Sequence, residues 1–264
     1  MGLILNGNEP NKILYNGAEV SLYFNGSKIW PAGVDPYNPL NLPPNTIRVR
    51  TSDGNPPVKD SSTTYETATL VEGTTDVYDV YKSGTNFSNL FARSSNLVEV
   101  LGANTTGITN MANMFSVCNA LTTVALFNTT TVLYMDNMFV SCSSLTTVPL
   151  FNTSNVTSMI VMFYNCTSLT TAPLFDTSKV ENISSMFAGC TSLTAVPLYD
   201  TSSVWNMSQM FYNCINVQSG AHDLYWQALR QTTPPSKHSK TFYNCGSNTT
   251  TGAADLARIS YDWK

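Results

Sequence analysis

Charged side chains are scarce in this chain of 264 residues. They make up 11% of the residues, the formal net charge is -4, and only five of them lie between positions 104 and 217. No cluster of Lys and Arg forms the basic patch that nucleic-acid binding requires, so we expect no nucleic-acid partner. No apolar run reaches the roughly 20 residues that a membrane-spanning helix needs, so we expect no membrane insertion.

The sequence also lacks the patterns of catalysis and of metal binding. Its two histidines, His222 and His238, have no nucleophile or acid placed beside them by spacing, and an active site needs such convergent groups. The six cysteines include no C-x-x-C pair of the kind that binds zinc. We therefore expect no enzymatic activity, no metal and no other cofactor.

What the chain does contain is a repeat. Five cysteines follow a Met-Phe-x-x motif at one constant interval: Cys118, Cys142, Cys166, Cys190 and Cys214. A fixed period of roughly 20–50 residues is typical of stacked coils. A weaker copy begins at Leu90, one interval before Met114. The next motif after Cys214 ends late, at Cys245, so the period is broken there by an insertion.

Each coil contains two hydrophobic patterns. Apolar side chains recur every three to four residues over positions 156–166, which predicts a short helix. Leu169, Ala172 and Leu174 then have the spacing L-x-x-L-x-L, typical of the strand in a leucine-rich repeat. We predict an α/β repeat solenoid, leucine-rich-repeat-like, with 24-residue coils of short helix plus short parallel strand. Proline lacks the N–H that a strand donates, so Pro149, Pro173 and Pro197 predict that the strand is short.

The five periodic cysteines are best interpreted as structural. Buried free Cys behaves as a small hydrophobic residue. Neighbouring side chains of stacked coils rarely reach the torsion angle that a disulfide requires. We therefore predict a buried ladder of free thiols.

Pairs of threonine precede the predicted strand in three successive coils. They are Thr122 and Thr123, Thr146 and Thr147, and Thr170 and Thr171. Threonine favours pleated surfaces, so the simpler interpretation is that the pairs do no more than keep an uncharged surface soluble. The alternative is a binding ladder for a glycan or another polar surface. Phe151, Phe175 and Tyr199 would then be aromatic platforms, unless their rings are buried between coils.

Segments on both sides of the repeats have different compositions. Asn-Gly pairs at Asn6, Asn16 and Asn25 predict an antiparallel meander in residues 1–30, because Asn-Gly favours tight hairpin turns. Five prolines predict a stiff linker in residues 31–45. The remaining predicted segments are a β cap at 46–89 with strands at 46–50, 65–71 and 77–81, the solenoid at 90–217, and an irregular last coil with a C-terminal cap at 218–264, including a helix at 223–230.

The repeats resemble the BspA-type leucine-rich repeats of bacterial surface proteins. The shared pattern is Met-Phe-x-x-Cys-x-Ser-Leu-Thr followed by Asp-Thr-Ser-x-Val-x-x-Met, and it occurs here from Met186 and from Asp200. This resemblance covers about residues 91–217. The flanks resemble bacteriophage proteins: residues 16–30 are similar to N-terminal modules of tail and fibre proteins, and residues 244–256 to a terminal segment of some phage-encoded repeat proteins.

These resemblances imply a bacteriophage virion structural protein, a component of a tail fibre, tail tip or head fibre that is assembled in the host cytoplasm. Residues 1–30 would contact other virion proteins or further copies of the chain, and the solenoid would contact a host-surface glycan or protein. Two alternatives stay open. A bacterial cell-surface adhesin would need a signal peptide, lipobox or wall-sorting tail, and none is visible. An ice- or glycan-binding protein would explain the threonines but not the Asn-Gly pairs or the prolines.

Overall fold

The computed structural model describes residues 4–5, 13–15, 18–20, 38 and 40–264. Three short strands lie in the first part: β1 (Ile4–Leu5), β2 (Ile13–Tyr15) and β3 (Ala18–Val20). They pair antiparallel in that order, which agrees with the predicted meander. The three Asn-Gly pairs, and Pro31, Pro36 and Pro39 of the predicted linker, lie outside the described residues.

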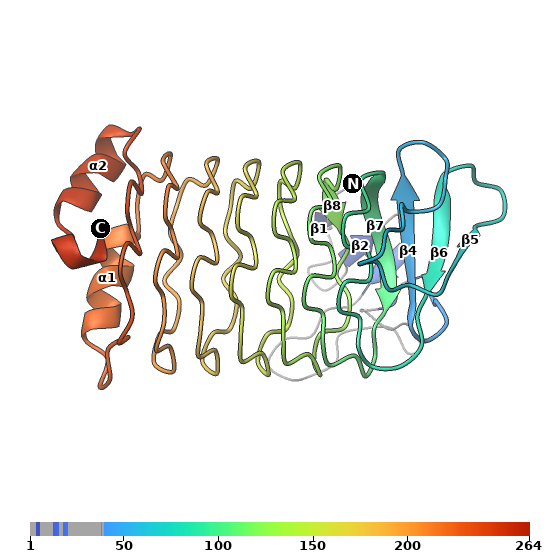
Figure 1. Cartoon of the computed structure of the whole chain (residues 1–264), viewed down its shortest axis with the longest axis horizontal. Helices are drawn as coiled ribbons and strands as arrows, with labels where there is room; N and C mark the ends of the chain where they lie inside the picture. Colours follow the sequence, from blue (N-terminus) through green and yellow to red (C-terminus); the bar gives the residue numbers. More distant parts are fainter. Residues whose placement is uncertain (1–3, 6–12, 16–17, 21–37, 39) are drawn as a thin grey trace.

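A five-stranded sheet stands at one end of the coils (Figure 1). Its strands, in spatial order, are β5 (Thr67–Leu70), β6 (Val77–Tyr81), β4 (Thr46–Thr51), β7 (Leu97–Asn104) and β8 (Thr123–Val124). The pairs are antiparallel except for β7 with β8, which is parallel. The strands predicted at 46–50, 65–71 and 77–81 are confirmed to within a few residues. Because β7 and β8 belong to successive coils, this sheet covers the first coil as a cap.

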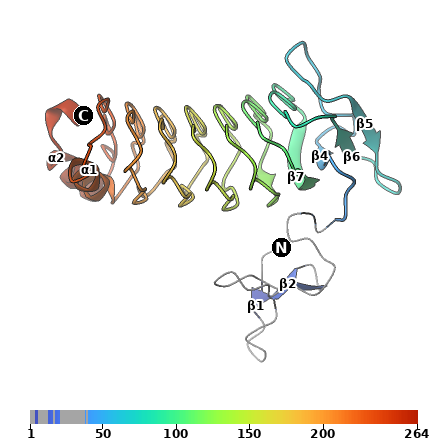
Figure 2. The same cartoon turned by 90° about the horizontal axis from the view of Figure 1, so that it is seen from below.

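From residue 85 onward the chain winds into coils that stack along one axis (Figures 1 and 2). Parallel bridges join equivalent residues of successive coils, from Asn86 through Asn110, Tyr134, Ser158 and Asn182 to Asn206. Alternate backbone N–H groups donate to the next coil, as from Phe115 to the Met138 oxygen at 2.9 Å. The sequence period is therefore also the period of the backbone contacts.

The predicted helix in each coil is wrong. The segment forms successive turns, because two residues four positions apart adopt left-handed backbone angles, such as Asn137 with φ 56° and Ser141 with φ 57°. The Cys142 N–H bonds to the oxygen of Phe139, three residues back. The N–H of Phe139 donates to Met162 in the next coil at 2.9 Å. A helix would use these donors within the coil, whereas the turns direct every second one outward and so stack the coils.

The predicted strand is present in the first coil as β7 and in the second as the two residues of β8, but it is wrong for the later coils. The oxygen of Pro149 accepts the N–H of Phe151, two residues on, at 3.0 Å, and Pro173 and Pro197 do the same in their coils. In such a three-residue turn the central residue stands at the tip. Leu150 is therefore 63% exposed, while Phe151 is 2% exposed. The third leucine of the L-x-x-L-x-L pattern leaves the core, and the neighbouring aromatic ring enters it.

Columns of like side chains fill the core. The rings from Phe91 to Phe211 stack in a line, with centroids 5.3–5.5 Å apart between successive coils. A second column consists of buried threonines whose hydroxyls donate to a backbone oxygen of the next coil at 2.6–2.8 Å: Thr105, Thr129, Thr153 and Thr177. Each coil thus presents the same surface to its neighbour, which explains why the sequence repeats.

Helices close the opposite end of the stack (Figure 1). They are α1 (Ala221–Leu229), α2 (Thr250–Ala257) and the 3-10 helix η1 (Tyr261–Trp263). The helix predicted at 223–230 is confirmed, and it occupies the extra residues between Asn206 and its bridge partner Lys237. Trp263 is 2% exposed and stacks on Phe242, so it covers the last ring of the column. No helix in the described part of the chain is long and apolar enough to cross a membrane.

Candidate binding surface

In two of the three threonine pairs, the two members differ in what they contact. The hydroxyl of Thr122 donates to the Val98 oxygen of the preceding coil at 3.0 Å, and that of Thr170 donates to the Thr146 oxygen at 3.4 Å. The second members, Thr123, Thr147 and Thr171, are exposed. Their hydroxyls form no hydrogen bond with any residue that the structure describes. The Thr122 and Thr170 hydroxyls therefore contribute to stacking, whereas the second members, and the exposed Thr146, are available to a partner.

Phe151, Phe175 and Tyr199 are buried, so their predicted role as aromatic platforms is wrong. They are only 2%, 3% and 0% exposed. The Tyr199 ring packs on Phe187, and its hydroxyl donates to the Pro173 oxygen at 2.7 Å. Burial raises the pKa of Tyr199 well above its ordinary value. The cause is the three-residue turn, which directs the residue after each leucine inward.

Leucines take the surface position that the aromatic residues were expected to hold, and sequence reasoning missed them. Leu126, Leu150, Leu174 and Leu198 are 37%, 63%, 60% and 56% exposed, one in each of four successive coils. The signal that could have found three of them is a proline directly before the leucine and an aromatic residue directly after it. The Leu-Thr face is defined here as these four leucines with Thr123, Thr147 and Thr171.

The Leu-Thr face is unusual because its leucines are aligned. Single exposed leucines are common on soluble proteins, but larger apolar patches mark contact surfaces. Here the leucine recurs once in each coil, on a stack whose coils contact one another throughout. None of the seven side chains is charged. The face can therefore bury apolar area against a partner without removing a charge from water.

The cysteines lie in the core. The six thiols are free and 0% exposed. The five periodic ones each donate to the oxygen of a phenylalanine of the preceding coil, at 3.0–3.1 Å. Desolvation raises the pKa of Cys118, Cys166 and Cys214 to about 12, so these groups stay protonated and unreactive near neutral pH. The structure thus places the thiol ladder where the sequence predicted it.

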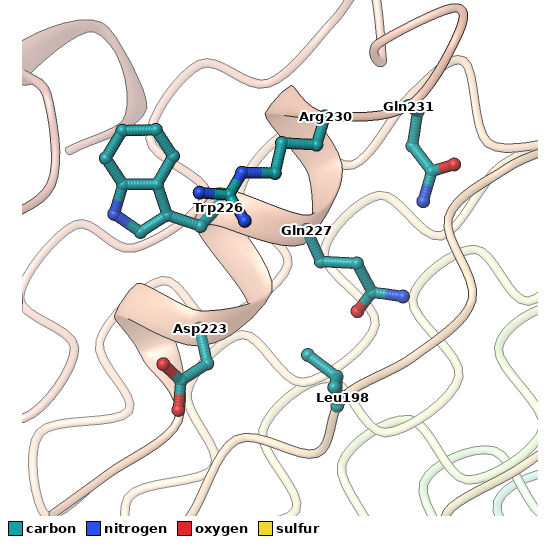
Figure 3. Close-up of a pocket in the computed structure, with 6 residues that line it drawn as sticks. All are labelled: Leu198, Asp223, Trp226, Gln227, Arg230 and Gln231. Carbon is teal, nitrogen blue, oxygen red and sulfur yellow. The ribbon is translucent and has the colours of Figure 1, made fainter.

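Two open grooves lie near the C-terminal cap. The first has a volume of ≈ 510 Å³ and is lined by Leu198, Asp223, Trp226, Gln227, Arg230 and Gln231 (Figure 3). The second, of ≈ 630 Å³, is lined by Ser208, Ser236, Lys237, His238, Ser239, Tyr261 and Asp262. Because Leu198 also belongs to the Leu-Thr face, the first groove, called the α1 groove here, continues that face past the last regular coil.

The histidines take part in aromatic packing. His222 is buried and accepts the indole N–H of Trp226 at its Nε2, at 2.6 Å. The ring of His238 stacks on Trp263, with centroids 4.3 Å apart. The described residues contain no group of three or more His, Cys, Asp or Glu side chains that could hold a metal ion.

Sequence comparison places the coils in a known family. The model of a family described as "Mycoplasma protein of unknown function, DUF285" matches residues 85–195 and 171–247. Together these matches span residues 85–247, more than half of the chain. The chain belongs to this family. The DUF285 segment begins just before the first coil and ends before α2, so it covers the Leu-Thr face and α1.

Other comparisons are sparser. No curated protein matches the chain. The crystal structure of a leucine-rich repeat protein from Eubacterium ventriosum is similar over 65% of this chain, with 20% identity and a TM-score of 0.42. The match covers 48% of that protein, so the chain spans about half of its length. Membership of DUF285 agrees with the BspA-type resemblance of the repeats, whereas the phage resemblance of the flanks has no counterpart in these comparisons.

Proposed function

We propose that this DUF285 protein is a non-enzymatic binding protein that holds a protein partner on its Leu-Thr face, in the manner of a cell-surface adhesin. The alignment of four exposed leucines on an uncharged strip carries the proposal. Apolar side chains at the centre of a contact surface, with few charges there, are typical of protein–protein interfaces. A nucleic acid would need a basic surface instead.

The size of the face bears on the affinity. Full burial of a leucine side chain contributes about 1.5–3 kcal/mol, so covering the exposed half of each of the four would contribute about 4 kcal/mol in total. A micromolar complex needs about 8 kcal/mol. Hydrogen bonds from the exposed threonines and neighbouring residues must supply the remainder. We therefore expect weak binding per molecule, which many copies on one surface would strengthen through avidity.

The virion role expected from the flanks is the second candidate. It would use the same Leu-Thr face and would add attachment through the sheet of β1, β2 and β3. The antiparallel order of these strands favours a separate small module, but the comparisons lend the phage interpretation no support. The cell-surface role is therefore the better proposal.

Binding of the labelled full chain to intact cells tests the proposed function. We expect saturable binding to at least one of a panel of mammalian and bacterial cell types, measured by flow cytometry, and its loss after the cells are treated with protease. A double variant, Leu150→Asp with Leu174→Asp, should abolish it. Leu133→Asp is the control, because Leu133 is also exposed, at 39%, but lies outside the Leu-Thr face. Equal binding by the double variant and the control would overturn the proposal, as would no binding to any cell type.

A further inference from the structure

The α1 groove is built around one face of a helix. Asp223, Trp226, Gln227 and Arg230 have the spacing i, i+3, i+4 and i+7, which places them side by side. The opposite face of α1 is buried against the end of the coils through Ala221, Leu224, Tyr225 and Ala228. Most of the groove is therefore carried by a helix packed on the end of the stack, and Leu198 and Gln231 complete it from outside the helix.

Trp226 is held in place although 43% of its surface is exposed. Its indole N–H donates to His222 Nε2 at 2.6 Å, and the two rings meet edge to face at 86°. The Tyr225 ring lies 5.6 Å away, between centroids. Separately, the backbone N–H of His222 donates to the Asp255 carboxylate of α2 at 3.1 Å, which joins the two helices. An aromatic ring fixed in this way loses little conformational entropy when a ligand covers it.

Polar groups of the groove lack partners within the described part of the chain. The Gln227 Oε1 atom is shielded from solvent and accepts no hydrogen bond there. Asp223 and Arg230 form no ion pair there either, and the Arg230 guanidinium lies over the Trp226 ring, 5.4 Å from its centroid (Figure 3). Gln231 makes one long contact, from its Nε2 to Thr201 Oγ1 at 3.4 Å. The Gln227 Oε1 atom cannot meet a ligand while it is shielded, but the Gln227 side chain lines the groove, and its amide N–H groups, which form no hydrogen bond with the described residues, can donate to a ligand there.

The chemistry of these groups selects the class of ligand. One carboxylate and one guanidinium cancel in charge, which disfavours an anionic ligand. The carboxylate accepts hydrogen bonds, the guanidinium donates them and the two amides do both, which matches neighbouring hydroxyls that each donate and accept. Arg230 lies over one face of the Trp226 indole, so the apolar C–H face of a sugar ring would pack on the opposite face. A lipid chain would leave the polar groups unpaired, at a free-energy cost.

From these features we infer that the α1 groove is a saccharide-binding site for a neutral hexopyranose unit. The site is separate from the protein contact proposed for the Leu-Thr face, although Leu198 borders both. A partner that carries a neutral glycan could occupy the two together. The inference stands on the groove alone and does not need the cell-surface role.

Ligand-observed NMR with the full chain tests this inference. The probes are neutral trisaccharides of glucose, mannose, galactose and N-acetylglucosamine, together with an acidic trisaccharide and an uncharged tripeptide. At least one neutral sugar should bind. Trp226→Ala should weaken that binding by about tenfold, as expected for loss of one aromatic platform. Trp205→Ala should leave it unchanged, and it is a matched control because Trp205 is 42% exposed and also lies beneath a cation, Lys237, at 4.9 Å.

A second variant separates binding from folding. Trp226→Ala also removes the bond to His222, so circular dichroism must show that the helices remain. Gln227→Leu keeps the size of the side chain, removes the amide that lines the groove and should weaken sugar binding several-fold. The inference is overturned if no neutral sugar binds, if only the acidic sugar or the tripeptide binds, or if Trp205→Ala weakens binding as much as Trp226→Ala. The Leu150→Asp, Leu174→Asp double variant should still bind the sugar, so failure of the Leu-Thr face would not be mistaken for failure of this site.

Discussion

Replacing Cys166 by aspartate tests whether the thiol ladder is a dry part of the core. Cys166 is 0% exposed, and its thiol donates to the Phe139 oxygen at 3.0 Å. Desolvation raises the pKa of this thiol to about 12, which shows how strongly the site disfavours an anion. A carboxyl group placed there meets the same surroundings. We therefore expect Cys166→Asp to fold with the new carboxyl protonated.

The free-energy loss follows from proton linkage. An ordinary Asp titrates near pKa ~3.9 when unfolded, and each pKa unit is worth about 1.36 kcal/mol. Keeping the buried group protonated at pH 7 thus costs about 4 kcal/mol. Because the pKa of this acid is raised on folding, the folded state binds more protons than the unfolded state. Stability is therefore retained below the unfolded pKa and is lost as pH rises, by about 1.4 kcal/mol per pH unit from roughly pH 4 to the folded pKa.

Urea unfolding at pH 4.5, 5.5, 6.5 and 7.5, followed by circular dichroism, measures this slope. Cys166→Ala removes only the sulfur and should cost about 1–2 kcal/mol at every pH. Thr171→Asp introduces the same charge at an exposed position of the same coil and should change stability by less than about 0.5 kcal/mol. If Cys166→Asp changed the free energy of unfolding as little as Thr171→Asp and showed no additional pH dependence, the site would be accessible to water and the buried thiol ladder would be refuted.

Three further predictions concern the same coils. Alkaline titration followed by circular dichroism should show that the free energy of unfolding falls from about pH 8.5 upward. The cause is that the pKa of Cys118, Cys166 and Cys214 is about 12 in the folded state, above the unfolded value, and each thiol should account for a loss of about 2 kcal/mol at pH 10. In urea unfolding, Leu169→Ala should cost about 2–5 kcal/mol and Leu174→Ala less than about 0.5, since the first leucine is 0% and the second 60% exposed; equal losses would contradict the assigned register. Val161→Asn should raise the free energy of unfolding by about 1 kcal/mol and so increase the urea midpoint, because Val161 has φ 59° and Asn137 occupies the same place in the preceding coil. A lower midpoint would count against strain at this turn.

Spacing between identical residues was informative because stacking requires it. The contacting segments of neighbouring coils must match residue for residue, so in the regular coils the distance from one Cys to the next equals the length of a coil. The burial of the thiols was predictable for a related reason. A position that is Cys in five coils, always in the motif Met-Phe-x-x-Cys, fits a buried column in which each coil leaves the same small space for a side chain. The caps at both ends were also predictable, since the end coils would otherwise expose their cores.

Local conformation was not predictable from hydrophobic spacing, because helices and paired turns share it. Apolar residues three to four apart face one side in a helix, and they also do so when two turns are each closed by a left-handed residue. The distinguishing signal is the residue before the cysteine: Asn165, Gly189 and Asn213 have positive φ angles of 57°, 77° and 58°. Asn and Gly tolerate this conformation, whereas helices disfavour Gly in their interior.

The Leu-Thr face was missed because the leucine-rich pattern assigns its third leucine to the core. Two apolar residues stand next to each other, Leu174 and Phe175, and only one can point inward. In three coils the oxygen of the preceding proline accepts the N–H of the aromatic residue and leaves leucine at the tip of the turn, but Leu126 is exposed beside buried Phe127 with Ala125 in that place. The repeat pattern could not predict the α1 groove, because α1 lies in the segment that interrupts the period.

The same stacking that defines the fold also sets the extent of the proposed binding face. Each coil satisfies its outward N–H groups only through its neighbour, so a single coil has no stability of its own, and the stack must end in a sheet on one side and in helices on the other. Between these caps, each regular coil from Leu126 onward adds one exposed leucine to the Leu-Thr face. A partner that contacts all four must therefore be extended along the stack. A compact partner would meet only one or two, and its affinity would change little if an outer coil were removed.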